Sequence, residues 1–342
     1  MNITKNFKIT LIISIIFSVI AIILGISIGS TDISLRDICT VFAHLITKNP
    51  FPEEFKTLNF NLIVNLRLPR VLLAFLVGGG LSVSGCILQS LLKNPLASAY
   101  SLGVSSAAGL AASLVMIFYA GTHGYIYMVI LGILASFLTV CLVMFFAQIT
   151  DKSLSTNTVI LTGMVISFFL NALMTTLAAS SAELASRIML WQLGSFASRG
   201  YTGVIVLSVV LPCIIVIFMI LSPALDIMSF GNSQANAIGV NTKILSWIFI
   251  LLVSTLTSVS VSFVGIIGFV DLIVPHIVRK IASSSHRKSI PLNFLIGGTF
   301  MILCDLFART AASPREIPIG SITALLGAPF FAFIYLKKRK VK

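Results

Sequence analysis

Charged residues are scarce in this 342-residue chain: Asp, Glu, Lys and Arg together make up 10% of it, against roughly a quarter in an ordinary soluble domain. Hydrophobic residues make up 57%. The formal net charge is +13, but a nucleic-acid-binding face needs its basic residues interleaved with polar and aromatic ones over a soluble surface. Such a surface is missing, so the composition predicts a protein of the lipid bilayer.

Residue patterns of enzymes and metal proteins are also missing. The five cysteines are widely spaced without a C-x-x-C pair, which favours small buried side chains over metal or redox chemistry. The four histidines (His44, His123, His276 and His286) lie in separate segments, none with a second histidine four residues away. The sequence contains no G-x-x-x-x-G-K-[ST] motif, so a partner would have to hydrolyse ATP if ATP drives this protein.

Long apolar runs dominate the sequence. A bilayer span needs about 20 mostly apolar residues. Hydropathy and turn residues predict ten such spans, at approximately 9–29, 70–92, 102–120, 125–148, 156–178, 201–222, 244–264, 266–281, 290–308 and 319–336. The first run, after Lys5 and Lys8, is too long for a typical signal peptide and lacks an A-x-A site, so we interpret it as a retained span. The eighth is short and contains Pro275, and a re-entrant segment stays open there.

The distribution of basic residues supports ten crossings. With Lys5 and Lys8 inside, twelve further Lys and Arg residues fall on the inner side, against only Asp151 and Asp226. The outer side holds nine basic residues and seven acids. Because Lys and Arg concentrate in cytoplasmic loops, the sequence predicts that both termini are cytoplasmic.

The second span, within "RLPRVLLAFLVGGGLSVSGCILQSLLKNPL" (67–96), has a charged mouth and a glycine-rich middle. Helices in lipid approach closely at small residues, so we interpret Gly78, Gly79, Gly80 and Gly85 as packing positions. Arg67 and Arg70 are three residues apart and share a helix face, and Arg309 ends the ninth span on the same outer side. Two roles stay open for these arginines: anchoring at lipid phosphates, and binding carboxylates of an outside partner.

Asp271, in "GFVDLIVPH", lies in or near the eighth predicted span. A carboxylate within the membrane is a functional hypothesis by default. A helix-start position near an interface is the alternative.

Seven blocks of the sequence resemble, in order, the signatures of the FecCD-type permeases. They are the stretch beginning "RLPRVLLAFLVGGG", then "LWQLGSF", "ANAIGV", "GIIGFVDLIVPHIVRK", "HRKSIPL", "CDLFART" and "EIPIGSITALLGAPFF", from about residue 67 to 333. These permeases are the membrane subunits of bacterial ATP-binding cassette (ABC) importers for iron-siderophore complexes, haem and cobalamin.

The resemblance implies an all-α membrane protein of the type II importer architecture, with residues 1–342 as a single transmembrane permease domain. It also implies the partners: a second permease subunit (homo- or heterodimer), two cytoplasmic ATPases that bind the ATP, and an outer substrate-binding protein. This chain itself would hold no cofactor, metal or catalytic residue. Ferric siderophore is the leading cargo, and an ion-coupled secondary transporter is the alternative function.

Site residues follow from the same resemblance. Arg67, Arg70 and Arg309 match arginines that pair with glutamates of the binding protein. The inner stretch 223–243 matches the loop that couples to the ATPase, with Gln234, Ala235, Ile238 and Gly239 at its core. The cytoplasmic gate falls at Asn94, Leu96, Thr156 and Asn157. Family members commonly have glycine at the position of Asp271, so the resemblance assigns no role to this carboxylate.

Overall fold

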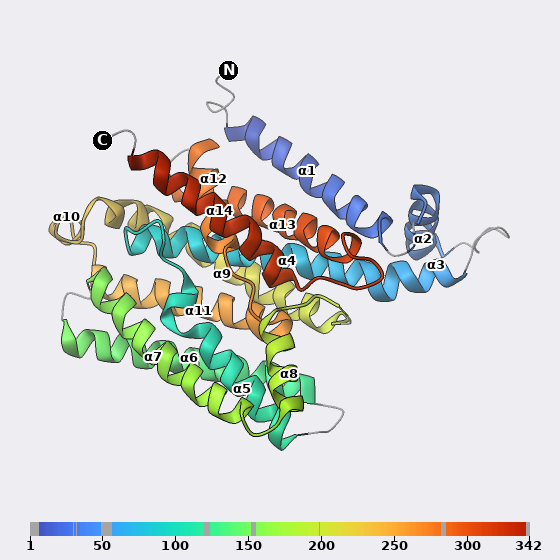
Figure 1. Ribbon diagram of the computed structural model, residues 1–342. Helices are drawn as coiled ribbons and strands as arrows, with labels where there is room; N and C mark the ends of the chain where they lie inside the picture. The colour runs from blue at the N-terminus through green and yellow to red at the C-terminus, as the bar shows by residue number, and fades with distance from the viewer. Residues whose placement is uncertain are drawn as a thin grey trace.

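The computed structural model describes residues 7–29, 31, 33–48, 57–119, 124–151, 155–197, 199–281 and 285–339; Lys5 and His123 lie outside them. Regular structure within these ranges is helical, without a β-strand (Figure 1). The α-helices are α1 (Phe7–Ser27), α2 (Leu35–Thr47), α3 (Thr57–Asn61), α4 (Leu68–Leu91), α5 (Val104–Phe118), α6 (Gly124–Thr150), α7 (Thr156–Ala178), α8 (Ala182–Gln192), α9 (Thr202–Phe230), α10 (Asn232–Ala237), α11 (Thr242–Val264), α12 (Val270–Ile281), α13 (His286–Thr310) and α14 (Ile319–Arg339).

Each of the ten predicted spans coincides with a helix, namely α1, α4 to α7, α9 and α11 to α14. Seven of these helices are long and apolar enough to cross a bilayer, while α5 and the described part of α14 are shorter apolar helices. The twelve residues of α12 would extend about 18 Å, less than the hydrocarbon thickness of about 30 Å. The predicted multi-span, all-helical fold is therefore confirmed, with α12 shorter than the predicted eighth span.

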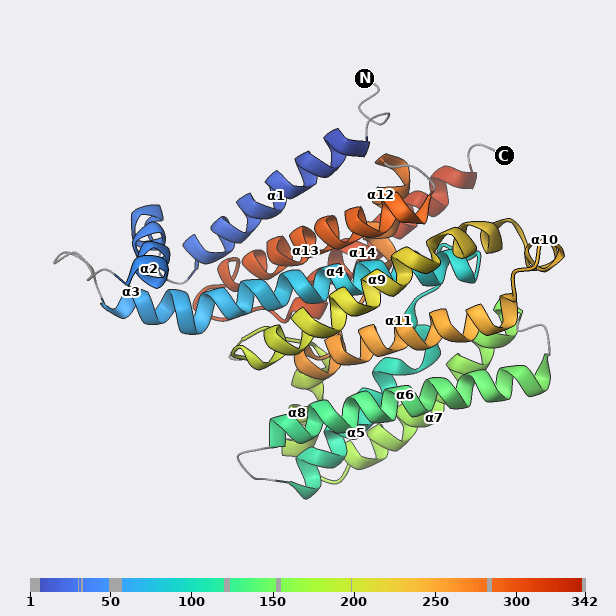
Figure 2. The same cartoon turned by 180° about the vertical axis from the view of Figure 1, so that it is seen from behind.

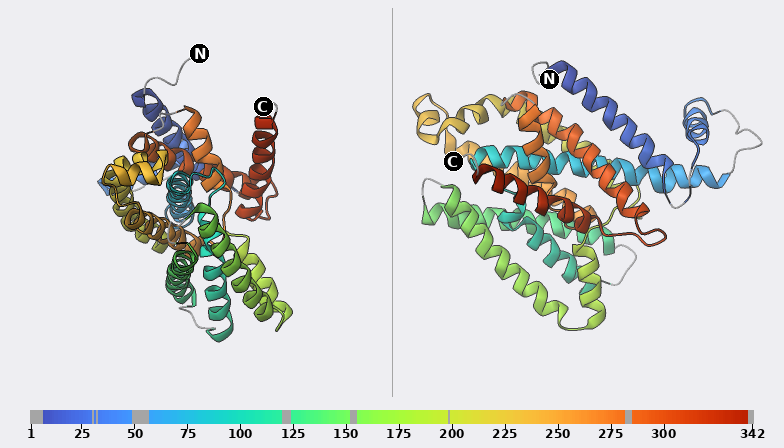
Figure 3. Two further views of the ribbon diagram at one scale, coloured as in Figure 1. Left: turned by 90° about the vertical axis from the view of Figure 1, so that its left-hand side faces the viewer. Right: turned by 45° about the horizontal axis from the view of Figure 1, so that its top comes forward.

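The long helices run along one common direction, which gives the bundle two ends (Figures 1 and 2). We call them the α10 end, where α10 projects, and the α2 end, where α2 and α3 project. The first residues of α1 and the last residues of α14 lie toward the α10 end (Figure 3). The described start of α1 and the described end of α14 are therefore on one side of the bundle, as an even number of crossings requires.

Helix α4 is the centre of the bundle. It packs against α9, α11, α12 and α13, and 83% of its most apolar window is buried. The exposed apolar side chains lie instead on peripheral helices such as α1 and α7. Only 28% and 17% of the residues in the most apolar windows of these two helices are buried. The lipid-facing surface and the core are thus built from the same residue types, and position in the bundle separates them.

Gly78, Gly79 and Gly85 of α4 are contact points with neighbouring backbones, whereas Gly80 faces only leucine side chains. The packing interpretation is thus confirmed at three of the four glycines. A Cβ atom on Gly78 would lie 2.4 Å from the carbonyl oxygen of Gly297 in α13. A Cβ on Gly85 would lie 1.8 Å from the carbonyl oxygen of Asp271 in α12. Real Cβ atoms do not approach other atoms this closely, so α4 reaches its neighbours only because these positions lack side chains.

An extended stretch precedes α12. Residues 265–269 are non-helical between the end of α11 and the start of α12, and they return the chain toward the α10 end. Tyr100 donates a hydrogen bond to the Ile267 carbonyl at 2.5 Å, and the amide of Ser195 donates to the Val264 carbonyl at 2.8 Å. Non-helical backbone is tolerated at membrane depth when it is buried in protein and bonded in this way.

Two helices outside the predicted spans complete the α2 end. The amphipathic helix α2 lies between the first two predicted spans and is capped by Ser34, whose hydroxyl accepts a bond from the Asp37 amide at 3.1 Å. Helix α8 is likewise capped by Ser181, which accepts from the Leu184 amide at 3.1 Å. Both are serine-capped starts of the kind that favours helices, but they are too short and polar to be found by a search for spans.

The contact at Gly85 generates a prediction. Replacing Gly85 with alanine forces α4 and α12 apart, and overpacking of this kind costs about 1–3 kcal/mol or more. We expect a clear drop in the thermal unfolding midpoint of the purified protein. Gly268→Ala is the matched control, because no atom lies within 4 Å of a Cβ added there. Equal midpoints for the two variants would contradict the packing interpretation.

Candidate functional site

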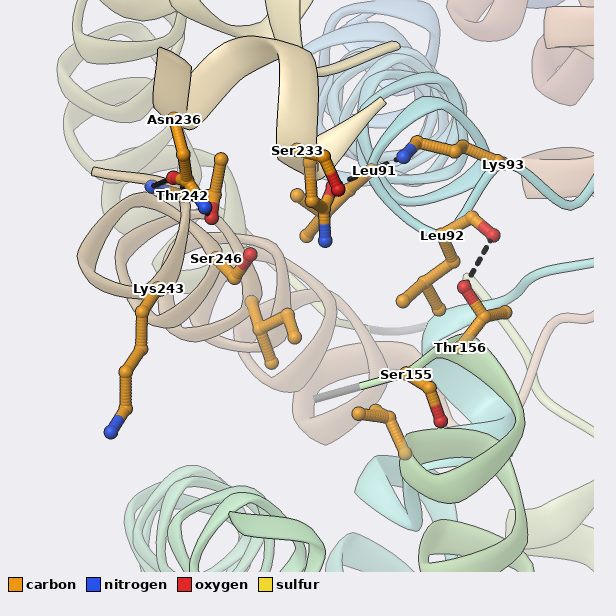
Figure 4. A pocket seen from close by; sticks show the side chains of 13 residues that line it. Leu91, Leu92, Lys93, Ser155, Thr156, Ser233, Asn236, Thr242, Lys243 and Ser246 are labelled. Atoms are coloured by element: carbon orange, nitrogen blue, oxygen red, sulfur yellow. Dashed lines mark hydrogen bonds between the residues drawn. The ribbon is translucent and has the colours of Figure 1, made fainter. Parts of the chain in front are cut away.

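A polar cavity of about 540 Å³ lies at the α10 end. It is bounded by the end of α4, the start of α7, α10 and the start of α11 (Figure 4). Its lining includes Lys93 and Lys243 and no acid; the full set is Leu91, Leu92, Lys93, Ser155, Thr156, Val159, Asn232, Ser233, Asn236, Thr242, Lys243, Ser246 and Ile250. The predicted gate and coupling segments, distant in sequence, thus meet around one cavity.

The two predicted gate segments touch each other at this cavity. The Thr156 hydroxyl, in the first turn of α7, donates to the Leu92 carbonyl at 2.8 Å. Two residues later Asn94 forms its own turn, with its side-chain oxygen accepting from the Leu96 amide at 2.9 Å. The side chains of Leu96 and Asn157 are exposed. The structure therefore joins the turn after α4 to the start of α7 through Thr156, and leaves Leu96 and Asn157 free of the core.

The coupling segment contacts the same turn. Lys93 donates from Nζ to the side-chain oxygen of Asn232, the first residue of α10, at 3.0 Å. At the other end of α10, the side-chain oxygen of Asn236 accepts from the Thr242 hydroxyl at 2.9 Å. Helix α10 is thus hydrogen-bonded to both α11 and the turn after α4.

The four predicted coupling residues differ in exposure. Gln234, Ile238 and Gly239 are exposed on the outside of the α10 segment. Gly239 has φ +88°, in the left-handed region that favours glycine. Ala235, in contrast, is fully buried in the apolar core beneath α10. Ala235 therefore faces inward on its helix, unlike the other three residues, and its role in coupling stays a prediction.

At the α2 end, the predicted docking residue Arg67 is directed into its own chain. Only 7% of it is exposed. Its guanidinium donates to the carbonyl oxygens of Ile26 at 2.8 Å, Ser27 at 2.7 Å and Thr31. These bonds satisfy carbonyls at the C-terminal end of α1, which have no partner within the helix. In this structure Arg67 fastens the end of α1 to the start of α4, and its docking role stays a prediction.

Arg70 and Arg309 share the buried carboxylate of Asp305. Arg70 binds Asp305 through Nε at 3.0 Å and Nη2 at 2.9 Å, and binds Glu316 through Nη1 at 2.7 Å. Arg309 lies 3.6 Å from Asp305 and donates to the carbonyl of Gly25 in α1. Arg309 is 7% exposed, whereas the side chain of Glu316 is 43% exposed. Arg70 and Arg309 therefore form an internal ion cluster with Asp305, and Glu316 lies at its surface.

Sequence reasoning missed the partners of these arginines and a second contact at the α10 end. His286 lies 2.5 Å from Asp226 through Nδ1 and 2.6 Å from the Ser90 hydroxyl through Nε2. Asp226 and His286 are 60 positions apart, and no local motif connects them. Among the described residues, no three His, Cys, Asp or Glu side chains gather where they could hold a metal ion.

Comparison with known proteins assigns this architecture to a family. The model of the FecCD transport family matches residues 16–337. The uncharacterized ABC transporter permease protein YvrB of Bacillus subtilis is 37% identical over 328 residues, covering 95% of this chain and 92% of that protein. The molybdate import system permease protein MolB of Haemophilus influenzae is 32% identical, covering 94% of each chain.

Two further matches agree. The Fe(3+)-citrate import system permease protein YfmE of Bacillus subtilis is 33% identical, covering 80% of this chain and 81% of that protein. A solved structure described as an inward-facing conformation of a metal-chelate type ABC transporter matches with a TM-score of 0.80 and 30% identity, over 97% of this chain and 100% of that one. The chain belongs to the FecCD transport family and is a multi-pass membrane permease subunit of an ABC importer.

Proposed function

We propose that this chain carries a ferric siderophore, or a closely related metal chelate, across the cell membrane into the cytoplasm. The proposal is supported by the Fe(3+)-citrate permease and the metal-chelate type transporter among its matches. Another match is named as a molybdate import permease, so molybdate is an alternative cargo. Haem and cobalamin are the other cargoes that the sequence resemblance implied. The ion-coupled secondary transporter considered from the sequence alone is set aside, because the chain belongs to an importer family.

The observation that carries the proposed mechanism is the pair of hydrogen bonds around the 540 Å³ cavity. Lys93 joins the turn after α4 to α10, and Thr156 joins the same turn to α7. A partner ATPase that displaces α10 would pull on this turn directly. We therefore propose that α10 and the exposed residues Gln234, Ile238 and Gly239 receive the force of ATP hydrolysis, and that Asn94, Leu96, Thr156 and Asn157 form the gate.

This mechanism needs two ATPase copies, a second permease subunit and a fixed orientation. We propose that the α10 end is cytoplasmic, since Lys8, Lys93, Lys243, Lys280 and Lys288 lie at helix ends on that side. ATP would be bound by the ATPase, and the permease would supply no cofactor. Exposed Leu161, Val165 and Phe168 give α7 an apolar face suited to a second permease subunit or to lipid.

The α2 end would then receive the binding protein. We propose that the docking surface at the α2 end, the mouth of the permease, is centred on Arg70 and Glu316. Beneath it, Arg67 and Arg309 fasten α4 and α13 to the end of α1. Glu316 forms an ion pair with Arg70 from the exposed side, with 2.7 Å between Oε1 and Nη1. An acidic residue of the binding protein could pair with Arg70 by replacing Glu316, since rim charges tune association and its salt dependence.

Transport itself is tested with the complete importer in proteoliposomes. With a radiolabelled ferric siderophore outside, we expect accumulation that requires ATP inside and the binding protein outside. Molybdate, haem and cobalamin are assayed in parallel. Accumulation of one of these in place of iron would correct the cargo, and ATP-independent accumulation would contradict the proposed mechanism.

Docking is tested by two substitutions of opposite expected effect. Arg70→Ala removes the proposed contact and should weaken capture of the binding protein about tenfold, with a smaller salt dependence. Glu316→Ala removes the competing carboxylate and should strengthen capture about threefold. The measurement is equilibrium binding at low and high salt, with Lys280→Ala at the α10 end as the control. Weaker binding by both mouth variants would show that Arg70 is not the docking cation.

Coupling is tested at Gly239. A tryptophan there adds bulk to an exposed turn and strains a backbone with φ +88°. We expect uptake per ATP hydrolysed to fall about tenfold or more while hydrolysis continues, because the α10 segment no longer seats in the ATPase. Gly239→Ala carries the backbone strain with little bulk and separates the two causes. Unchanged coupling in both variants would place the ATPase contact elsewhere.

A further inference from the structure

The turn that carries the proposed gate residues Asn94 and Leu96 is held at both of its flanks by one residue of α12. Before the turn, Gln89 donates from Nε2 to the backbone carbonyl of Asp271 at 2.9 Å. After the turn, the Ser98 hydroxyl donates to the Asp271 carboxylate. The residues between the two contacts include the whole turn and both gate side chains.

This contact is buried and has no charged partner. Asp271 is 1% exposed, Gln89 3% and Ser98 8%. No Lys, Arg or His lies within ion-pair distance of Asp271 in the described part of the chain, and its second carboxylate oxygen has no hydrogen-bond partner. A buried polar group of this kind is costly. The buried Asp271 side chain is therefore stabilised by its hydrogen bond with Ser98, since it is shielded from solvent and has no ion-pair partner among the described residues.

Neighbouring contacts orient the groups that bond to Asp271. Arg279 donates to the side-chain oxygen of Gln89, which turns the amide NH₂ of Gln89 toward Asp271. Gly85, one turn earlier in α4, leaves room for the Asp271 carbonyl to approach. Tyr100 adds a third bond, to the Ile267 carbonyl. Three hydrogen bonds of the segment from Gln89 to Tyr100 thus go to Asp271 and to the stretch just before α12. They act beside the bonds that join Ser90, Leu92 and Lys93 to α13, α7 and α10.

The start of α12 is itself seated on α14. Phe269, two residues before Asp271, has φ 69°, a strained conformation for a residue other than glycine. Its ring fills the space left by Gly327 of α14, where a Cβ would lie 2.3 Å from the ring. A shift of α14 would consequently move Phe269, and with it Asp271.

We propose that Asp271 is a positioning residue for the gate: it clasps the turn between Gln89 and Ser98 to α12, so that the turn follows the movements of α12 and α14. The inference rests on the proposed gate role of Asn94 and Leu96. It gives the buried Asp271 carboxylate a function in conformational coupling, without any contact with cargo.

The clasp is tested first without partners or cargo. Backbone amide hydrogen exchange of residues 92–98 is measured for the purified permease in lipid nanodiscs, as the native chain and as the variants Asp271→Ala, Ser98→Ala and Asp271→Asn. Loss of the buried bond between Ser98 and Asp271 should accelerate exchange in this turn about fivefold in the two alanine variants. Ser98→Ala also removes the hydroxyl that accepts from the Tyr100 amide. The double variant, Asp271→Ala with Ser98→Ala, should be no faster than the faster single one. Asp271→Asn keeps an oxygen acceptor for Ser98 and should exchange at the native rate.

Ser98→Ala is a mild change outside the long helices and keeps the test informative if Asp271→Ala does not fold. Ser180→Ala is the matched control, because the exposed Ser180 hydroxyl bonds only within its own turn. Exchange at the native rate in both alanine variants would overturn the proposal. So would fast exchange in Asp271→Asn with native exchange in Ser98→Ala, because the charge and not the hydrogen bond would then matter.

The second measurement links the clasp to transport. In the complete importer, Asp271→Ala and Ser98→Ala should lower uptake per ATP hydrolysed about fivefold, and Asp271→Asn should restore it. Native uptake per ATP in the two alanine variants would overturn the gate role of Asp271. Failure of the native importer to move any cargo would count against the proposed function alone, since the exchange experiment still decides whether the clasp holds the turn.

Discussion

The close approach of α4 to its neighbours is the constraint on which the bundle depends. Inside a bilayer, lipid tails solvate apolar side chains as well as another helix does, so helices associate through close packing and polar contacts. Helix α4 achieves this with Gly78 against Gly297 and Gly85 against Asp271, where backbone meets backbone. These two contacts fix α13 and α12 on α4, and the other helices assemble around that unit.

The broken segment before α12 follows from the same constraint. Because α11 ends at Val264 and α12 begins only at Val270, the first turn of α12 lies in the middle of the bundle, beside Gly85. The non-helical backbone is bonded by Ser195 and Tyr100 from other segments, which removes the cost of exposing it to lipid. If α11 and α12 formed one continuous helix, Asp271 would not lie in a first helical turn, and its carboxylate would not reach the turn that follows α4.

Much of the fold was predictable because it depends on local patterns. Apolar runs of span length located ten helices, and the small residues of α4 identified its packing face. The contacts of the candidate site were not predictable, because they join distant positions: Ser98 and Asp271 are 173 residues apart, and Arg67 is 41 from Ile26. The arginines at the mouth show the limit clearly. Their spacing predicted a shared face, but their burial depends on where α1 ends and which carbonyls it leaves unpaired.

The two ends of the bundle differ in how costly they are to rearrange. At the α2 end, Arg70 and Arg309 share the buried Asp305, and breaking a buried ion pair costs about 3–5 kcal/mol. At the α10 end, the turn after α4 is held to α10 and α7 by single hydrogen bonds at partly exposed positions, worth about 0.5–1.5 kcal/mol each. The ion cluster at the α2 end is therefore costlier to open than either of these two hydrogen bonds. The α10 end has buried polar contacts of its own, between His286 and Asp226 and at Asp271, so the two ends differ at the turn after α4, where the bonds of Lys93 and Thr156 are more exposed, and not in the presence of buried charge.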